Sequence, residues 1–141
     1  MFMGQIHFDK KNVPKLKLVV DDTLRFFRGI GYEPQGIYIV GSNARSMRSE
    51  YHSGILMYID NAQKLIREVG IRGSDLDILV KTDAHVKGKP DIDGFFNGKP
   101  DATLEDYHEE EFRRTQINVW YNQELSSVED WVRIYPSFKM S

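Results

Sequence analysis

Apolar residues recur with helical spacing in two long segments of the chain. Between Pro14 and Arg28 they repeat every three or four residues, with the proline suited to a first helical turn and Gly29 suited to the end. A second apolar stripe runs through residues 53–69 and is followed by Gly70. The pattern therefore predicts two amphipathic helices, over residues 14–28 and 53–69.

Three shorter apolar runs have the character of strands. Residues 37–40 form a nearly unbroken apolar run that ends at Gly41-Ser42, which is typical of a strand buried on both faces. Residues 76–80 and 116–121 also predict strands, because β-branched and aromatic side chains favour extended structure. Helices and strands that follow one another in this way predict a single α/β (α+β) domain over residues 1–141.

The segment before the last of these strands is irregular. It carries Gly-Lys-Pro-Asp twice, at residues 88–91 and 98–101, and we expect a loop or hairpin excursion over about residues 83–105. The charged run 105–114 predicts a short helix with a solvated face. Residues 126–131 predict a capped final turn or short helix.

Composition narrows the class of protein. The chain has 141 residues, with 19 lysines and arginines against 21 aspartates and glutamates, so only a local basic patch would favour a nucleic-acid partner. It has no cysteine, which excludes disulfides and thiolate metal sites and makes the cytoplasm the expected location. No signal-peptide pattern occurs, and no segment approaches the roughly 20 apolar residues of a membrane span. We therefore expect no membrane partner.

Two aspartates at the start of a predicted strand are the first candidates for chemistry. Asp75 and Asp77 are two residues apart, so a strand places both carboxylates on one face, and Leu76 points the other way. Adjacent anions repel, and Mg²⁺ suits them because one or two carboxylates plus substrate phosphates commonly hold it. The same spacing recurs at Asp91 and Asp93, where an acidic turn explains it, so a solvated strand start remains the alternative for the first pair.

The turn after residues 37–40 is a candidate phosphate site. Gly41 permits close approach of the backbone, and Ser42 at the start of a helix offers hydroxyl and amide donors. Arg45, one turn later, either reaches a phosphate with two hydrogen bonds or forms a surface ion pair. The alternative is a plain strand-to-helix turn with Ser42 as its N-cap.

In this order and context, Gly41-Ser42 and Ser74-Asp75-Leu76-Asp77 resemble the signature of the nucleotidyltransferase superfamily, which includes polymerase-β-like and minimal nucleotidyltransferases. The resemblance implies a mixed β-sheet flanked by helices and two divalent metal ions, Mg²⁺ (or Mn²⁺), held by Asp75 and Asp77. It also implies that an NTP is the substrate. Gly41 and Ser42 would hold its β- and γ-phosphates, and Arg45 and Ser74 are the other expected nucleotide-binding residues.

The chain departs from the family pattern in two places. Thirty-one residues separate Ser42 from Ser74, which is longer than in minimal members, so the helix over 53–69 would be an insertion or an elongated element. In addition, Asn118 stands where the family usually has a third carboxylate that helps to hold the catalytic metal and activate the acceptor. An asparagine offers a carbonyl oxygen but neither a charge nor a base.

Asn118 therefore leaves several hypotheses open. The chemistry is weaker, another carboxylate such as Glu111 or Asp106 replaces the missing one, or the domain binds nucleotide without turnover. A further alternative is that Asn118 is only a polar residue on an exposed strand face.

The leading hypothesis is a Mg²⁺-dependent nucleotidyltransferase that moves a nucleoside monophosphate from an NTP to an unidentified hydroxyl, with Asp75, Asp77 and Asn118 as catalytic residues. A helical partner protein or a homodimer would complete the site. Three hypotheses compete with it. The first is a catalytically silent nucleotide-binding or interaction module of the same fold, such as an antitoxin or a sensor. The second is a site for a metal-bound nucleotide sugar, and the third is a purely structural protein.

The histidines lack metal-binding spacing, and the aromatic residues are expected mostly in the core.

Overall fold

The computed structural model describes residues 8–9, 13–51, 58–73, 75–92 and 115–137. These residues form three α-helices and six strands, with one short 3-10 helix, η2, near the end. The elements in chain order are β1 (Phe8–Asp9), α1 (Leu16–Gly29), β2 (Pro34–Val40), α2 (Gly41–Tyr51), α3 (Ile59–Val69), β3 (Ile71–Arg72), β4 (Asp75–Thr82), β5 (Gln116–Tyr121), η2 (Leu125–Ser127) and β6 (Trp131–Tyr135).

A four-stranded mixed sheet forms the centre of the molecule. Its strand order is β5-β4-β2-β6, in which β4 pairs parallel with β5 and β2 pairs antiparallel with both β4 and β6. The short strands β1 and β3 pair separately as an antiparallel ribbon. The sheet and its helices confirm the predicted class, a mixed β-sheet flanked by helices.

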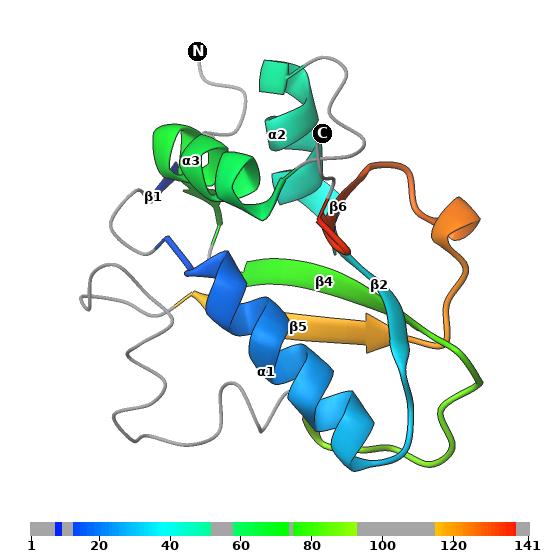
Figure 1. Cartoon of the computed structure of the whole chain (residues 1–141). Coiled ribbons are helices and arrows are strands. Elements are labelled where there is room, and N and C mark those ends of the chain that lie inside the picture. The colour runs from blue at the N-terminus through cyan, green and yellow to red at the C-terminus, as the bar shows by residue number, and fades with distance from the viewer. Residues whose placement is uncertain (1–7, 10–12, 52–57, 74, 93–114, 138–141) are drawn as a thin grey trace.

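Alternation along the strands gives the sheet one core face. In β4, Leu76 and Ile78 are fully buried in the hydrophobic core, whereas Asp75 and Asp77 belong to the opposite face. The helices supply the other half of that core, and Figure 1 shows α1 lying across the sheet. The helical core residues are Leu16, Val19, Phe27, Ala44, Met47, Ala62 and Ile66. The face that carries the aspartates is therefore opposite the face on which the helices pack.

The helical part between β2 and β4 differs from the sequence-based expectation. We predicted one helix over residues 53–69, and the structure has α3 from Ile59 to Val69, with residues 52–57 outside the described part of the chain. Residues 41–51 form α2, whose full extent the sequence did not reveal. Glycine, serine and asparagine have low helix propensity, so α2 depends on packing, and Ala44 and Met47 are fully buried.

The expected capped final turn or short helix over residues 126–131 is present only at its start, and the prediction missed the strand that follows. The structure has only the three residues of η2 there, followed by strand β6. Residues 131–135 alternate with a period of two: Val132 and Ile134 are buried in the core, and the residues between them are only half-buried. The Ser-Ser and acidic residues that resemble a helix cap lie instead in the connection that leads into this strand.

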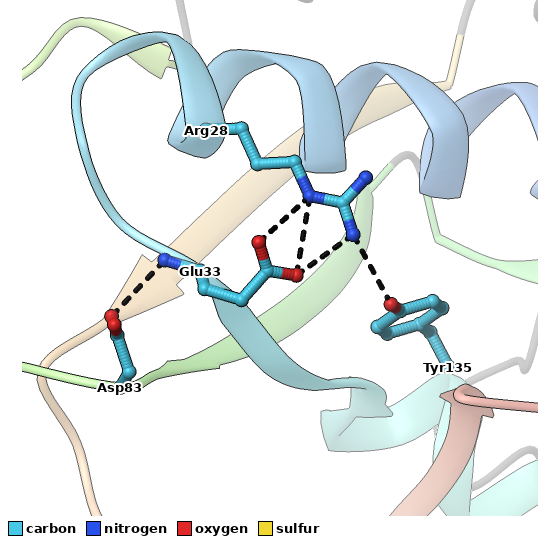
Figure 2. A network of polar contacts seen from close by, with 4 residues as sticks. All are labelled: Arg28, Glu33, Asp83 and Tyr135. Atoms are coloured by element: carbon cyan, nitrogen blue, oxygen red, sulfur yellow. Dashed lines mark hydrogen bonds and ion pairs between the residues drawn. The ribbon is translucent and has the colours of Figure 1, made fainter.

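A surface network ties the end of α1 to the strands. Arg28 donates from Nε and Nη2 to the carboxylate of Glu33, at 2.9 and 2.7 Å, and Nη2 also lies 3.5 Å from the hydroxyl of Tyr135 (Figure 2). The backbone N–H of Glu33 donates to Oδ1 of Asp83 at 3.0 Å. The hydrogen bond from Arg28 is the main reason why the pKa of Glu33 is lowered. The network fixes the turn that leads from α1 into β2, the strand that ends at the candidate site.

Candidate functional site at the ends of β2 and β4

The junction of β2 and α2 places Gly41 against Asp77. Helix α2 starts directly after Val40, and Gly41 has a φ of +77°, a conformation that side chains other than glycine rarely adopt. A β-carbon at position 41 would lie 3.3 Å from Oδ2 of Asp77, which is tighter than an ordinary contact. Both observations explain the glycine, and they show that the backbone at the start of α2 approaches the Asp77 carboxylate closely. Gly41 and Ser42 are exposed there.

The two aspartates of β4 lie on one face, as the period of two predicts. Asp75 is exposed and Asp77 is half-buried. The antiparallel register pairs Asp77 with Val40, the last residue of β2. The carboxylate therefore lies beside the turn that the sequence marked as a phosphate site.

Asn118 lies directly beside Asp77 across the parallel strands. The register pairs the two residues, and Nδ2 of Asn118 donates to Oδ1 of Asp77 at 3.0 Å. Oδ1 of Asn118 accepts from Nε2 of Gln116 at 3.2 Å. Asn118 is half-buried on the Asp77 face of the sheet, so it belongs to the same cluster of polar groups. The position at which the family resemblance predicts a third carboxylate is thus adjacent to Asp77, and an amide occupies it.

Asn43 is a structural part of this site that sequence reasoning missed. Its side chain is 3% exposed, and Nδ2 donates to the backbone carbonyl of Asp75 at 2.8 Å. Its Oδ1 accepts from the backbone N–H of Arg72 at 2.7 Å. These two bonds tie the first turn of α2 to the start of β4, and so fix Gly41 relative to Asp77. An asparagine next to a Gly-Ser turn was the only available sign, and in sequence it suggests nothing more than an ordinary turn.

Arg45 forms the ion pair that was one of its two predicted alternatives. Its Nε donates to Oδ2 of Asp130 at 3.0 Å, and its Nη2 lies 3.3 Å from Oε2 of Glu129. The hydrogen bond that Arg45 donates to Asp130 is the main reason why the pKa of Arg45 is raised. These partners are 84 and 85 residues away in the sequence, and no local pattern indicates the pairing.

A cavity of about 310 Å³ opens beside these groups. Gly41, Asp77 and the ion pair of Arg45 with Asp130 supply its polar wall. Its apolar lining consists of Val40, Leu79, Trp120 and Val128. The cavity therefore joins a carboxylate and an exposed helix start to an apolar surface, which is the usual composition of a small-molecule site.

The remaining sequence candidates lie elsewhere or outside the described residues. Ser74, Asp93, Asp106 and Glu111 fall outside the described residues. Asp91 is exposed in the segment after β4 and is not among the described residues that line the cavity. Within the described ranges, no group of three histidines, aspartates or glutamates has a metal-binding arrangement, and no helix is long and apolar enough to span a membrane.

Comparison with known proteins adds no relative. The chain has no significant match among protein-family models, curated proteins or solved structures. The functional interpretation consequently rests on this chain's own residues and their geometry.

Proposed function

We propose that this chain is a Mg²⁺-dependent nucleotidyltransferase domain, which transfers a nucleoside monophosphate from an NTP to a hydroxyl and releases pyrophosphate. One observation carries the proposal: Gly41 and Asn118 both meet Asp77, although the three residues come from α2, β4 and β5. The start of α2 and Asp77 thus lie side by side, as the family resemblance requires, and Asp75 lies two residues before Asp77 on the same strand face. The sequence order alone does not guarantee that proximity.

The residues present suit a magnesium ion. Asp75 and Asp77 offer two carboxylates on one face, and Mg²⁺ commonly takes only one or two from the protein and the rest of its ligands from phosphates and water. Asn118 now donates an N–H to Asp77, and rotation of its amide by half a turn would present the oxygen instead. When bound, the metal would neutralise charge on the phosphates and on the leaving pyrophosphate.

The chain's own groups then have distinct tasks. The exposed start of α2 at Gly41 and Ser42 would bind and orient phosphate oxygens, because backbone N–H groups are unpaired in the first turn of a helix. Asp75 and Asp77 would hold the metal, and Asn43 would keep these two parts of the site in register. Orientation of this kind accelerates phosphoryl transfer without a covalent intermediate.

A second candidate function is nucleotide binding without turnover, as in a sensor or interaction module. Asn118 favours it, because an amide cannot accept the proton of an attacking hydroxyl. The pairing of Arg45 with Glu129 and Asp130 also favours it, because this guanidinium already binds two carboxylates. A helical partner protein or a second copy of the chain would bring the acceptor in the first case and receive the signal in the second.

We propose the cytoplasm as the location of the protein, because its sequence contains no cysteine.

Transfer of label from α-phosphate-labelled NTPs distinguishes the two functions. The chain is incubated with each of the four NTPs and Mg²⁺, with the chain itself, RNA and a small-molecule extract as hydroxyl acceptors, and pyrophosphate release is followed in parallel. The enzyme hypothesis predicts transfer that Asp77→Asn abolishes and Asp91→Asn leaves unchanged. Mg²⁺-dependent NTP binding with neither transfer nor pyrophosphate would favour the second function. Transfer that survives Asp77→Asn would contradict the proposed site.

A further inference from the structure

The apolar side of the cavity lies two residues beyond the polar pair Asp77 and Asn118, further along strands β4 and β5. The parallel register of β4 and β5 pairs Asp77 with Asn118 and, two residues later, Leu79 with Trp120. Residues two apart share a face, so Leu79 and Trp120 follow the polar pair at a distance of about 7 Å along the strands, from a rise of roughly 3.3 Å per residue. Leu79 is fully buried, and Val128 from the connection before β6 completes this side of the cavity.

Trp120 is unusually exposed for a side chain of its size. Its exposed fraction is 48%, the largest of the exposed large hydrophobic side chains in the described chain. The other tryptophan provides a contrast, because Trp131 is half-buried and packs edge-to-face on Tyr38 with ring centroids 5.3 Å apart. Among the described residues, Trp120 packs on no other ring. An exposed indole that lines a cavity can bind a flat ligand, whereas a buried indole already packs against the protein interior.

We propose that Trp120 is the stacking platform for the base of the bound nucleotide, with Leu79 and Val128 as its apolar surroundings. The proposal rests on the proposed function, because it takes the phosphates to lie at Gly41 and Asp77. A ribose can bridge the step of about 7 Å between that polar end and the indole. Stacking on an aromatic side chain is sequence-tolerant, because every base has a π-face.

The lining also predicts the selectivity of this subsite. Gln123, three residues after Trp120, also lines the cavity, and its amide has both donor and acceptor groups. One amide of this kind can pair with any base, so we expect little discrimination between adenine and guanine. Purines should bind more tightly than pyrimidines, because they offer the larger stacking surface.

Calorimetric titration of three ligands distinguishes the contribution of the base to affinity from that of the phosphates. The ligands are MgATP, Mg-tripolyphosphate and adenosine. In the wild type, MgATP should bind about 10- to 100-fold more tightly than Mg-tripolyphosphate, which corresponds to a stacking free energy of roughly 1–3 kcal/mol. Trp120→Ala should remove that difference and abolish adenosine binding, but leave Mg-tripolyphosphate binding unchanged. Trp120→Phe should keep most of the difference because it retains an aromatic ring, and Trp131→Phe should behave as the wild type.

The outcomes distinguish the base subsite from the proposed function. Equal affinity of the wild type for MgATP and Mg-tripolyphosphate would overturn the role of Trp120 but leave the function standing, and this comparison needs no variant. Adenosine binding that depends on Trp120 but not on Asp77, without any binding of Mg-tripolyphosphate, would support the subsite and overturn the proposed function. Unchanged MgATP binding by a folded Trp120→Ala variant would also overturn the subsite.

Discussion

The substitution Asn118→Asp tests the electrostatics of the site most sharply. In the wild type, the amide N–H of Asn118 satisfies one oxygen of the Asp77 carboxylate at 3.0 Å. The substitution keeps the shape of the side chain, removes the donor and places a second carboxylate oxygen at the same point. It also introduces the third carboxylate that the family resemblance leads one to expect. The carboxylates at positions 77 and 118 would then repel each other, and a bound divalent cation would relieve that repulsion.

The magnitude follows from the separation and the burial of the two side chains. Two unit charges about 4 Å apart interact by about 1 kcal/mol in water and about 4 kcal/mol near a protein surface. Both side chains are half-buried, and a hydrogen bond to a charged group is lost as well. We therefore expect the free energy of unfolding to fall by about 2 kcal/mol at neutral pH without divalent cations, which is a decrease in Tm of roughly 5–10 °C.

Thermal and urea unfolding, with and without Mg²⁺, measure this effect. A cation at about 100 times its dissociation constant stabilises the folded state by about 2.7 kcal/mol, which would cancel the penalty. Asn61→Asp, an exposed position on α3, is the control for the added charge and should show neither the loss nor the Mg²⁺ rescue. If Asn118→Asp were as stable as Asn61→Asp in the absence of metal, the pairing of residues 77 and 118 would be refuted. If Mg²⁺ restored nothing, the cation site would be refuted.

Three further predictions concern the parts that build the site. Gly41→Ala should cost about 1 kcal/mol or more in unfolding free energy and weaken nucleotide binding, because of its positive φ and the nearby Asp77 carboxylate, whereas Gly29→Ala, which meets nothing within 4 Å, should be nearly neutral. Asn43→Ala should destabilise by about 1–3 kcal/mol in urea unfolding, because two part-buried backbone groups lose their partner; a loss below about 0.5 kcal/mol would contradict that role. The lowered pKa of Glu33 means that its pairing with Arg28 stabilises the fold at neutral pH, so the stability difference between wild type and Glu33→Gln should vanish as the pH falls through and below the ordinary glutamate range; a difference that persisted there would contradict the ion pair.

The sequence predicted the elements whose apolar pattern is strong. Helix α1 and strands β2, β4 and β5 lie where their periodicity placed them, because each buries a regular apolar face or run in the core. Strand β6 was missed because Ser126-Ser127 and the acids after them resemble a helix cap, whereas the alternation that decides the structure begins only at Trp131. Most of α2 was missed because, over residues 41–48, for which burial is described, only Ala44 and Met47 are buried apolar residues, which is too few to produce a visible stripe.

The candidate site likewise has one part that the sequence predicts and another part that it does not. A local pattern is enough to place Asp75 and Asp77 on one face, because the period of a strand is independent of its neighbours. The bond from Asn118 to Asp77 depends on the parallel pairing of β4 with β5, and the ion pair of Arg45 with Asp130 joins positions 85 residues apart. Contacts of that range arise from the sheet order and cannot be read from spacing along the chain.

The most direct test of the central claim is calorimetric titration of MgATP into the wild type, Asp75→Asn/Asp77→Asn and Asp91→Asn/Asp93→Asn. We expect saturable binding that needs both Mg²⁺ and the first pair of aspartates. The second pair has the same spacing in sequence but stands in the Gly/Pro-rich segment, so its loss should leave the affinity within about threefold, or roughly 0.6 kcal/mol. Equal losses in the two double variants, or wild-type binding that is indifferent to Mg²⁺, would contradict the assignment of the site to β4 and the start of α2.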